Sequence, residues 1–368
     1  MKNATSQPSG IGYRTRVAAL TLVCALAAVT SAPAEAQQTY RFRFASYIGK
    51  AAAQSQATEW WAQEIDRRSN GRVKIQFFYQ AALLPAADTL RGIAEKRADL
   101  GYMANAYHPA ELPLSSVVGI PFITSNADAQ MRTFAELYKR NQAYRQEWAK
   151  QGVHVLLFHP LSENILGSRE PVRDVGGLKG KRIRGLGYIN QVLDIIGANP
   201  VAIAAPEVYE ALQRRTIDGY SGYAFEVVTA LKLNEVAPYT IGTGTGNYVF
   251  AATPIALSTW NDMPADLKTI MTEVSDQYAD KFVEFMARAE DEVCAAIKKS
   301  GGTVTVFSDQ DIDKMKAQIG DQIQKLWVKD ATTRGAAAEP FLTDYLGTLR
   351  KYESQSKYVS GVKRCARG

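Results

Sequence analysis

Residues 180–222 alternate strand-like and helix-like segments, and this alternation constrains the fold more than any other feature of the chain. Residues 181–185 read as a short strand, and residues 190–196 place their apolar side chains on one face of a helix. Gly197 ends that helix, and Pro206 suits the first position of the next one, where its missing N–H costs nothing. The stretch is therefore predicted to be a strand–helix–strand–helix–strand unit.

The same alternation runs through most of the chain, which predicts the α/β class. Residues 264–300 carry apolar side chains mostly at spacings of three and four, which predicts one long helix. At 1.5 Å per residue it would be roughly 55 Å long, longer than one domain is wide. Gly242, Gly244 and Gly246 lack the Lys-Ser/Thr pair of a phosphate loop, so we expect a hinge or turn there.

The first 36 residues have the pattern of a secretory signal peptide. Arg14 and Arg16 precede an apolar run at 17–30, and Ala34 and Ala36 supply the small residues of a cleavage site. The run is too short for a comfortable transmembrane span, although a retained anchor is the alternative. We expect a soluble, exported protein that begins at residue 37 and works in the periplasm.

Charge and composition exclude one broad class of partner. The formal net charge is +6, but lysines and arginines are scattered, and no basic stripe is interleaved with aromatic residues. Nucleic-acid binding is therefore not expected. With 46% hydrophobic and 22% charged residues, the composition is that of a globular protein of ordinary kind.

The chemistry-bearing residue types argue against an enzyme or a metal protein. The three histidines, His108, His154 and His159, form no recognised ligand motif, and no nucleophile-elbow or Walker sequence is present. Cys294 and Cys365 follow the predicted leader and have no metal-ligand spacing, so neither metal nor cofactor is expected. An exported compartment permits a disulfide between them, and two independent buried thiols are the alternative.

Four linked blocks carry a family resemblance. They are GLKGKRIR at 177–184, GANPV at 197–201, EVYEALQ at 207–213 and DG at 218–219. In order and spacing they resemble the central motif of the DctP-type periplasmic solute-binding proteins, which serve tripartite ATP-independent periplasmic (TRAP) transporters. Glu207, Tyr209 and Asp218 belong to this motif. Glu207 also suits a structural role, since a carboxylate in the first turn of a helix meets its positive end.

The resemblance covers residues 40–330 or so, and it implies a two-lobed periplasmic-binding-protein fold with a long helix across both lobes. By that analogy lobe I holds 38–160 plus 248–288, and lobe II holds 161–247 plus 289–368. The implied function is to clamp a small organic solute between the lobes and deliver it to a TRAP membrane permease. A ligand sensor that presents the solute to a membrane kinase is the alternative.

The resemblance also assigns a ligand residue. Members of this family hold a ligand carboxylate with an Arg whose place is taken here by Arg184, and a guanidinium grips a carboxylate through two parallel bonds. Many members have a second Arg where this chain has Glu163. If Glu163 faces the ligand, the solute should carry one carboxylate and, further along, a hydroxyl or amine donor. If Glu163 pairs with Arg184, a neutral polyhydroxy solute becomes possible.

Four further residues are pocket candidates. Tyr47, Asn105, Tyr107 and Tyr223 follow or lie in predicted strands. Asn105 and Tyr107 stand where the resemblance places polar positions of the family, and Tyr223 lies in the window where many members have an Asn. Tyrosines would supply flat walls and hydroxyl donors. The alternative for each is an ordinary core or surface residue.

Overall fold

The computed structural model describes residues 1, 3–6, 38–203 and 205–368. The apolar run and cleavage site of the predicted leader lie outside the described residues. Residues 41–368 form one compact unit, and the fold below is that of this unit. Within the described residues, none of the helices combines the length and apolar character needed to cross a membrane.

Five strands form the first sheet, in the spatial order β2-β1-β3-β10-β4. Its strands are β1 (Tyr40–Ser46), β2 (Val73–Phe78), β3 (Leu100–Ala104), β4 (Val153–Pro160) and β10 (Phe250–Ala256). Strands β1 and β3 are parallel, and β10 runs antiparallel to both β3 and β4. One strand of this sheet therefore comes from a segment nearly a hundred residues beyond the others.

Six strands form the second sheet, in the order β11-β9-β5-β8-β6-β7. Its strands are β5 (Asn164–Ser168), β6 (Arg182–Gly185), β7 (Asn199–Ala202), β8 (Gly219–Ala224), β9 (Tyr239–Gly242) and β11 (Thr303–Val306). Strand β6 is parallel to both β7 and β8, while β5 is antiparallel to β8 and β9. Each sheet is the centre of one lobe of a two-lobed α/β architecture.

The strand–helix–strand–helix–strand unit predicted at 180–222 is confirmed. It consists of β6, α6 (Tyr188–Ile195), β7, α7 (Val208–Gln213) and β8. Buried side chains of α6, among them Val192 and Leu193, pack into the core of the second lobe with Ile183 of β6. Gly197 has φ +84°, a conformation that suits glycine and turns the chain from α6 into β7.

The α-helices of the first lobe come from two stretches of the chain. They are α2 (Ala53–Arg68), α3 (Thr89–Ala94), α4 (Ala127–Arg140), α5 (Gln142–Lys150) and α9 (Leu257–Asp262). The pattern predicts a single helix at 127–151, which is wrong, because Asn141 adopts extended backbone dihedrals and divides it. The side chain of Asn141 accepts a hydrogen bond from the Tyr144 N–H and so caps the second helix.

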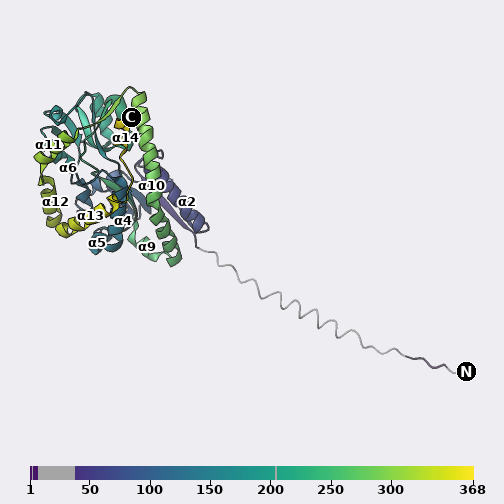
Figure 1. The fold of residues 1–368 in the computed structure, drawn as a ribbon. Helices are drawn as coiled ribbons and strands as arrows, with labels where there is room; N and C mark the ends of the chain where they lie inside the picture. Colours follow the sequence, from purple (N-terminus) through teal and green to yellow (C-terminus); the bar gives the residue numbers. More distant parts are fainter. Residues whose placement is uncertain (2, 7–37, 204) are drawn as a thin grey trace. The chain divides into compact units, whose positions relative to one another are not determined.

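The long helix is confirmed as α10 (Ala265–Lys299), which packs against α2 in Figure 1. After β11 come α11 (Asp309–Ile319), α12 (Gln322–Thr333), α13 (Ala338–Glu353) and α14 (Gly361–Arg367). Helix α14 packs against α10 and β11, whereas α13 packs against α4 of the first lobe. The chain crosses between the sheets at 161–163 and at 243–249, and we call these the crossing segments.

Candidate functional site

The carboxyl ends of parallel strands in both sheets carry the predicted site residues. Arg184 lies in β6, and Tyr223 lies near the end of the neighbouring β8. In the first sheet, Tyr47 directly follows β1 and Asn105 directly follows β3. Ligands of open α/β sheets bind beyond the carboxyl ends of such strands.

Arg184 is held in place by its own backbone surroundings. Its side chain is buried, with only 2% of the residue exposed. Nε donates to the Ile203 carbonyl at 3.1 Å, and Nη1 donates to the carbonyls of Ser221 and Gly222 at 3.2 and 3.3 Å. The guanidinium carbon lies 4.5 Å from the centre of the Tyr223 ring, which adds a cation–π contact. Among the described residues, no carboxylate forms an ion pair with Arg184.

Tyrosines from both sheets surround this charge. Burial raises the pKa of Tyr107, Tyr223 and Tyr248, and the positive charge of Arg184 opposes the rise in each case. The ring of Tyr47 meets the ring of Tyr107 edge-on, with centroids 5.9 Å apart. Burial also raises the pKa of Tyr47. We call these five residues, Arg184 and the four tyrosines, the Arg184 cluster. It brings Tyr107, from the turn after β3 of the first sheet, to Arg184 in β6 of the second.

Tyr248 is a member of this cluster that the sequence analysis does not assign to the site. It lies in the second crossing segment, and its hydroxyl donates to the same Gly222 carbonyl that accepts from Arg184. Gly222 has φ +82°, and a Cβ atom there would lie 3.0 Å from the Tyr248 hydroxyl and 3.2 Å from Nη1 of Arg184. The available signal was its position two residues after the glycine-rich stretch 242–246, in the segment that joins the two sheets.

The amide of Asn105, two residues before Tyr107, bonds to the backbone on both sides. Nδ2 donates to the Ser115 carbonyl at 3.2 Å, and Oδ1 accepts from the Phe250 N–H at 3.0 Å. These bonds tie the turn after β3 to the start of β10. The contacts of Asn105 are thus those of a structural residue.

Glu163 has different contacts from those expected. It is fully buried, and its Oε2 accepts a hydrogen bond from Ser360 at 2.6 Å and lies 3.4 Å from the Lys363 ammonium. No ion pair joins Glu163 to Arg184 among the described residues, so the pairing alternative is wrong. Its neighbour Asn164, the first residue of β5, bonds to the Gly222 N–H instead, whereas the two partners of Glu163, Ser360 and Lys363, both belong to the end of the chain. Glu163 therefore faces the C-terminal segment.

The three motif residues lie outside the cluster. Asp218 forms an ion pair of 2.9 Å with Arg182, and this hydrogen-bonded partner lowers the pKa of its carboxyl. The Tyr209 hydroxyl donates to Glu235 at 3.3 Å. Glu207 is exposed and precedes α7 without making a side-chain cap bond. These contacts stabilise the second lobe locally.

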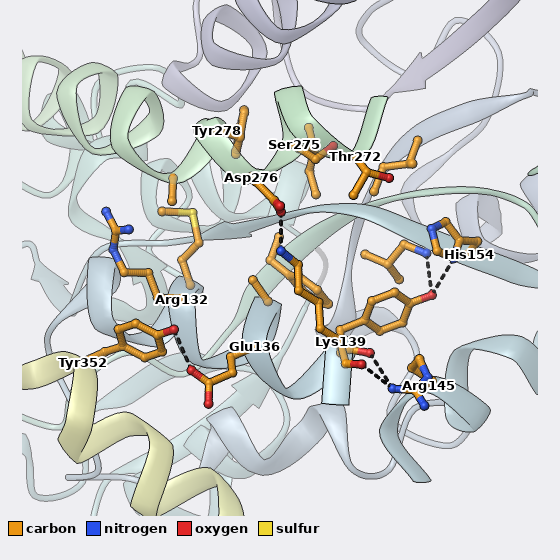
Figure 2. Close-up of a pocket in the computed structure, with 18 of the residues that line it drawn as sticks. Arg132, Glu136, Lys139, Arg145, His154, Thr272, Ser275, Asp276, Tyr278 and Tyr352 are labelled. Carbon is orange, nitrogen blue, oxygen red and sulfur yellow. Dashed lines mark hydrogen bonds and ion pairs between the residues drawn. The ribbon is translucent and has the colours of Figure 1, made fainter. Parts of the chain in front are cut away.

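A cavity of about 480 Å³ lies elsewhere, between α4, β4 and α10 (Figure 2). Two of its cations are paired with carboxylates of α10: Lys139 bonds to Asp276, as Figure 2 shows, and Arg132 bonds to Asp280. A third, Arg145, donates to the backbone carbonyls of Tyr138 and Lys139. It contains no member of the Arg184 cluster, so we do not assign it as the solute site. In the described part of the chain, no three His, Cys, Asp or Glu side chains are arranged to hold a metal ion.

Comparison with known proteins gives a family match over most of the chain. The model of "Bacterial extracellular solute-binding protein, family 7" (DctP) matches residues 44–330. The 2,3-diketo-L-gulonate-binding periplasmic protein YiaO of Escherichia coli is 21% identical over 84% of this chain and 92% of its own. A protein of Salmonella typhimurium, YiiZ, is 23% identical, but that match spans only 50% of this chain and 56% of the relative.

Solved structures show the same fold. A TRAP periplasmic solute-binding protein from Desulfovibrio salexigens, crystallised as an open complex, is 27% identical with a TM-score of 0.74, covering 87% of this chain and 98% of that one. A TRAP solute-binding protein from Rhodoferax ferrireducens in complex with copurified benzoate has a TM-score of 0.78 at 19% identity, covering 86% and 99%.

Proposed function

Since this chain belongs to family 7 of the bacterial extracellular solute-binding proteins, we propose that it is a periplasmic receptor for a small organic acid. It would bind the acid at Arg184, between the lobes, and deliver it to a TRAP-type membrane permease. The proposal makes the chain a receptor rather than an enzyme. Export through the predicted leader fits the periplasmic names of its relatives.

The buried charge of Arg184 is the observation that carries this proposal. Of the described lysines and arginines, only Arg184 is buried, and it has carbonyl and ring partners but no carboxylate. A buried cation is stabilised by an anionic partner, and a solute carboxylate offers that partner in a geometry the guanidinium fits. Because Tyr223 lies in the second sheet and Tyr107 follows a strand of the first, a solute bound at this charge would contact both lobes.

The contacts of the site also favour a solute with a single negative charge. With a single buried cation and Glu163 occupied by Lys363, the site we propose takes one carboxylate rather than two. The tyrosine rings favour a flat or partly apolar body with an acceptor for their hydroxyls. The benzoate bound by the Rhodoferax ferrireducens protein is a solute of this kind, found on the same fold.

Solute binding should favour closure through a higher affinity for the closed form than for the open one. We propose that the crossing segments at 161–163 and 243–249 are hinge elements. The lobe boundaries that we expect lie at 160/161, 247/248 and 288/289. The first segment would then begin directly at a boundary, and the second would contain one.

The test is to identify the solute by mass spectrometry of the purified protein, and then to titrate Arg184→Ala by calorimetry. We expect the variant to lose about 2–5 kcal/mol of binding free energy, because a buried carboxylate would be left unpaired. Arg182→Ala is the matched control: it lies on the same strand but half-exposed, paired with Asp218, and should change binding by less than about 1 kcal/mol. Equal affinities for the two variants would refute the proposal.

A further inference from the structure

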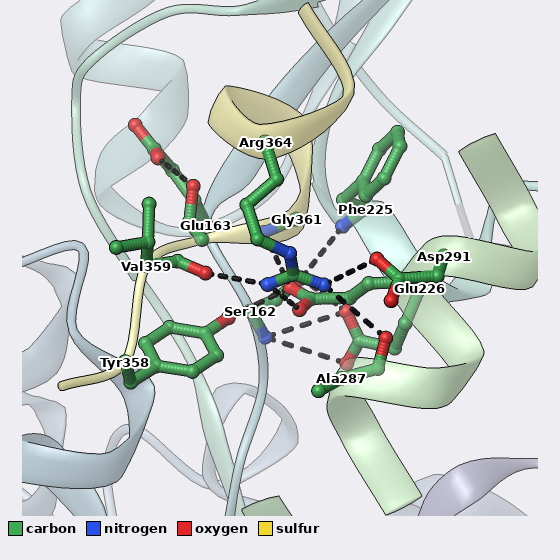
Figure 3. Close-up of polar contacts among 12 residues, drawn as sticks. Ser162, Glu163, Phe225, Glu226, Ala287, Asp291, Tyr358, Val359, Gly361 and Arg364 are labelled. Carbon is green, nitrogen blue, oxygen red and sulfur yellow. Dashed lines mark hydrogen bonds and ion pairs between the residues drawn. The ribbon is translucent and has the colours of Figure 1, made fainter. Parts of the chain in front are cut away.

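Three buried glutamates gather where the C-terminal segment meets the crossing of the lobes, and Figure 3 labels two of them, Glu163 and Glu226. Glu163 lies in the first crossing segment, Glu226 follows β8, and Glu290 lies in α10. Glu163 and Glu290 are 0% exposed, and Glu226 is 6% exposed. The solute site described above uses none of them. Buried carboxylates are costly unless paired, so their partners should reveal what they do.

Residues 358–365, which we call the clasp, supply the partners of two of these carboxylates. Glu290 accepts from the Tyr358 hydroxyl at 2.7 Å and the Gly361 N–H at 3.0 Å, and lies 3.2 Å from the Arg364 guanidinium. A Cβ atom on Gly361 would lie 2.4 Å from Cβ of Glu290, so only glycine allows this approach. The clasp therefore fits closely against α10.

The clasp also reaches the first crossing segment and the first lobe. Ser360 donates to Glu163, and the Lys363 ammonium lies 3.4 Å from the same carboxylate. Lys363 also donates to the Ser125 hydroxyl at 2.8 Å, just before α4. One short segment thus contacts a hinge element, the long helix and the first lobe at once.

Glu226 holds the same crossing segment from the other side. It accepts from the Ser162 N–H and hydroxyl and from Nε2 of Gln54 in α2 at 3.0 Å. Burial raises the pKa of Glu226, and burial with the nearby charge of Glu226 raises that of Glu290 to about 7. Tyr102, Tyr358, Arg364 and Lys363 are the other charged or titratable groups facing these three carboxylates.

One covalent bond fastens the clasp. Cys365 at its end is disulfide-bonded to Cys294 of α10, with Cα atoms 5.7 Å apart. Arg364 adds an ion pair of 2.6 Å to Asp291, one turn earlier on α10. The disulfide closes a loop of 71 residues, so without it the clasp would be joined to α10 only by non-covalent contacts.

We propose that the clasp is a redox-sensitive lock on the hinge. This inference rests on the proposed function in one respect, because it takes the crossing segments to be the hinge. While the disulfide is intact, the clasp holds the segment 161–163 against α10. A dithiol reductant breaks the S–S bond, leaving two thiols on the protein and a disulfide on the reductant. Lys363 and Arg364 then separate from their carboxylates. Glu163 and Glu290 can regain water only if the crossing opens, so reduction loosens the hinge.

The experiment measures amide hydrogen exchange on the full exported chain with and without dithiothreitol, and needs no solute. We expect exchange in the first crossing segment to rise by on the order of tenfold or more on reduction, while exchange in α4 stays unchanged. The double variant Cys294→Ser/Cys365→Ser should exchange fast in that segment and should not respond to dithiothreitol. Thiol labelling verifies that reduction is complete. If exchange in the segment is then still unchanged, the proposal is overturned.

A second variant covers the case in which reduction unfolds the chain. Lys363→Gln/Arg364→Gln keeps the disulfide but removes both cations, so it should show the fast exchange of the segment without any reductant. Slow exchange in this variant would overturn the lock. If reduction speeds exchange in the segment but the protein binds no carboxylate, the proposed receptor function is refuted and the redox-sensitive lock is not. The two failures are therefore distinguishable.

Discussion

Replacing Gly222 by alanine tests whether the Arg184 cluster depends on a backbone that approaches two side chains closely. The new Cβ atom would lie 3.0 Å from the Tyr248 hydroxyl and 3.2 Å from Nη1 of Arg184, closer than such atoms normally come. One of the two hydrogen bonds to the Gly222 carbonyl must lengthen. In addition, alanine at φ +82° has a backbone cost of about 1 kcal/mol or more.

Gly180→Ala provides the matched control. Gly180 has a similar φ of +73°, but nothing lies within 4 Å of its Cβ position. The backbone cost is therefore shared by the two variants, and the difference between them reports the contacts alone. A hydrogen bond from a charged donor contributes about 1.5–3 kcal/mol, so Gly222→Ala should be destabilised by about 2–4 kcal/mol more than Gly180→Ala once crowding is included.

Urea unfolding gives the free energy of unfolding of both variants, and calorimetry with the identified solute gives their binding affinities. Gly222→Ala should also bind the solute more weakly than the wild type, because Arg184 and Tyr248 must move, whereas Gly180→Ala should bind it as the wild type does. Equal unfolding free energies within about 0.5 kcal/mol, together with unchanged solute affinity, would show that the close approach at Gly222 does not position Arg184.

Two further changes probe single contacts. Tyr248→Phe removes the hydroxyl that bonds to the Gly222 carbonyl. In calorimetry it should weaken solute binding by about 1 kcal/mol, which is less than the loss expected for Arg184→Ala. A loss as large as that of Arg184→Ala would contradict this prediction. Burial raises the pKa of Glu147 to about 7 from 4.5, so the folded chain binds this proton more tightly than the unfolded one, and the free energy of unfolding should fall as pH rises from 4.5 to 7. Glu147→Gln should flatten that fall in urea titrations, and an unchanged slope would contradict the assignment.

Local pattern was enough to predict the elements that hold the site. Gly197 and Pro206 divide the chain into the unit from β6 to β8, and that unit alone places Arg184 beside Tyr223. The apolar spacing of α10 likewise needs no knowledge of its neighbours. These features follow from residues close together in the sequence, where periodicity and chain-breaking residues give a clear signal.

Residues whose contacts come from distant parts of the chain were predicted less well from the sequence. Glu163 accepts a hydrogen bond from Ser360, 197 residues later in the chain, and Asn105 accepts one from Phe250, 145 residues later. Neither pairing leaves a periodic trace in the sequence. Tyr248 lies two residues beyond the glycines where the sequence predicts a hinge or turn, and its contact depends on Gly222, which approaches it in three dimensions.

The three carbonyl bonds of Arg184 have a thermodynamic consequence for any carboxylate that it receives. A free arginine side chain must give up its rotameric freedom when it grips a ligand, which costs about 0.5–1.5 kcal/mol for a side chain of this kind. Here Ile203, Ser221 and Gly222 have already immobilised the guanidinium as the chain folds. The entropy cost of ordering this side chain is therefore incurred when the chain folds, and solute binding does not incur it again.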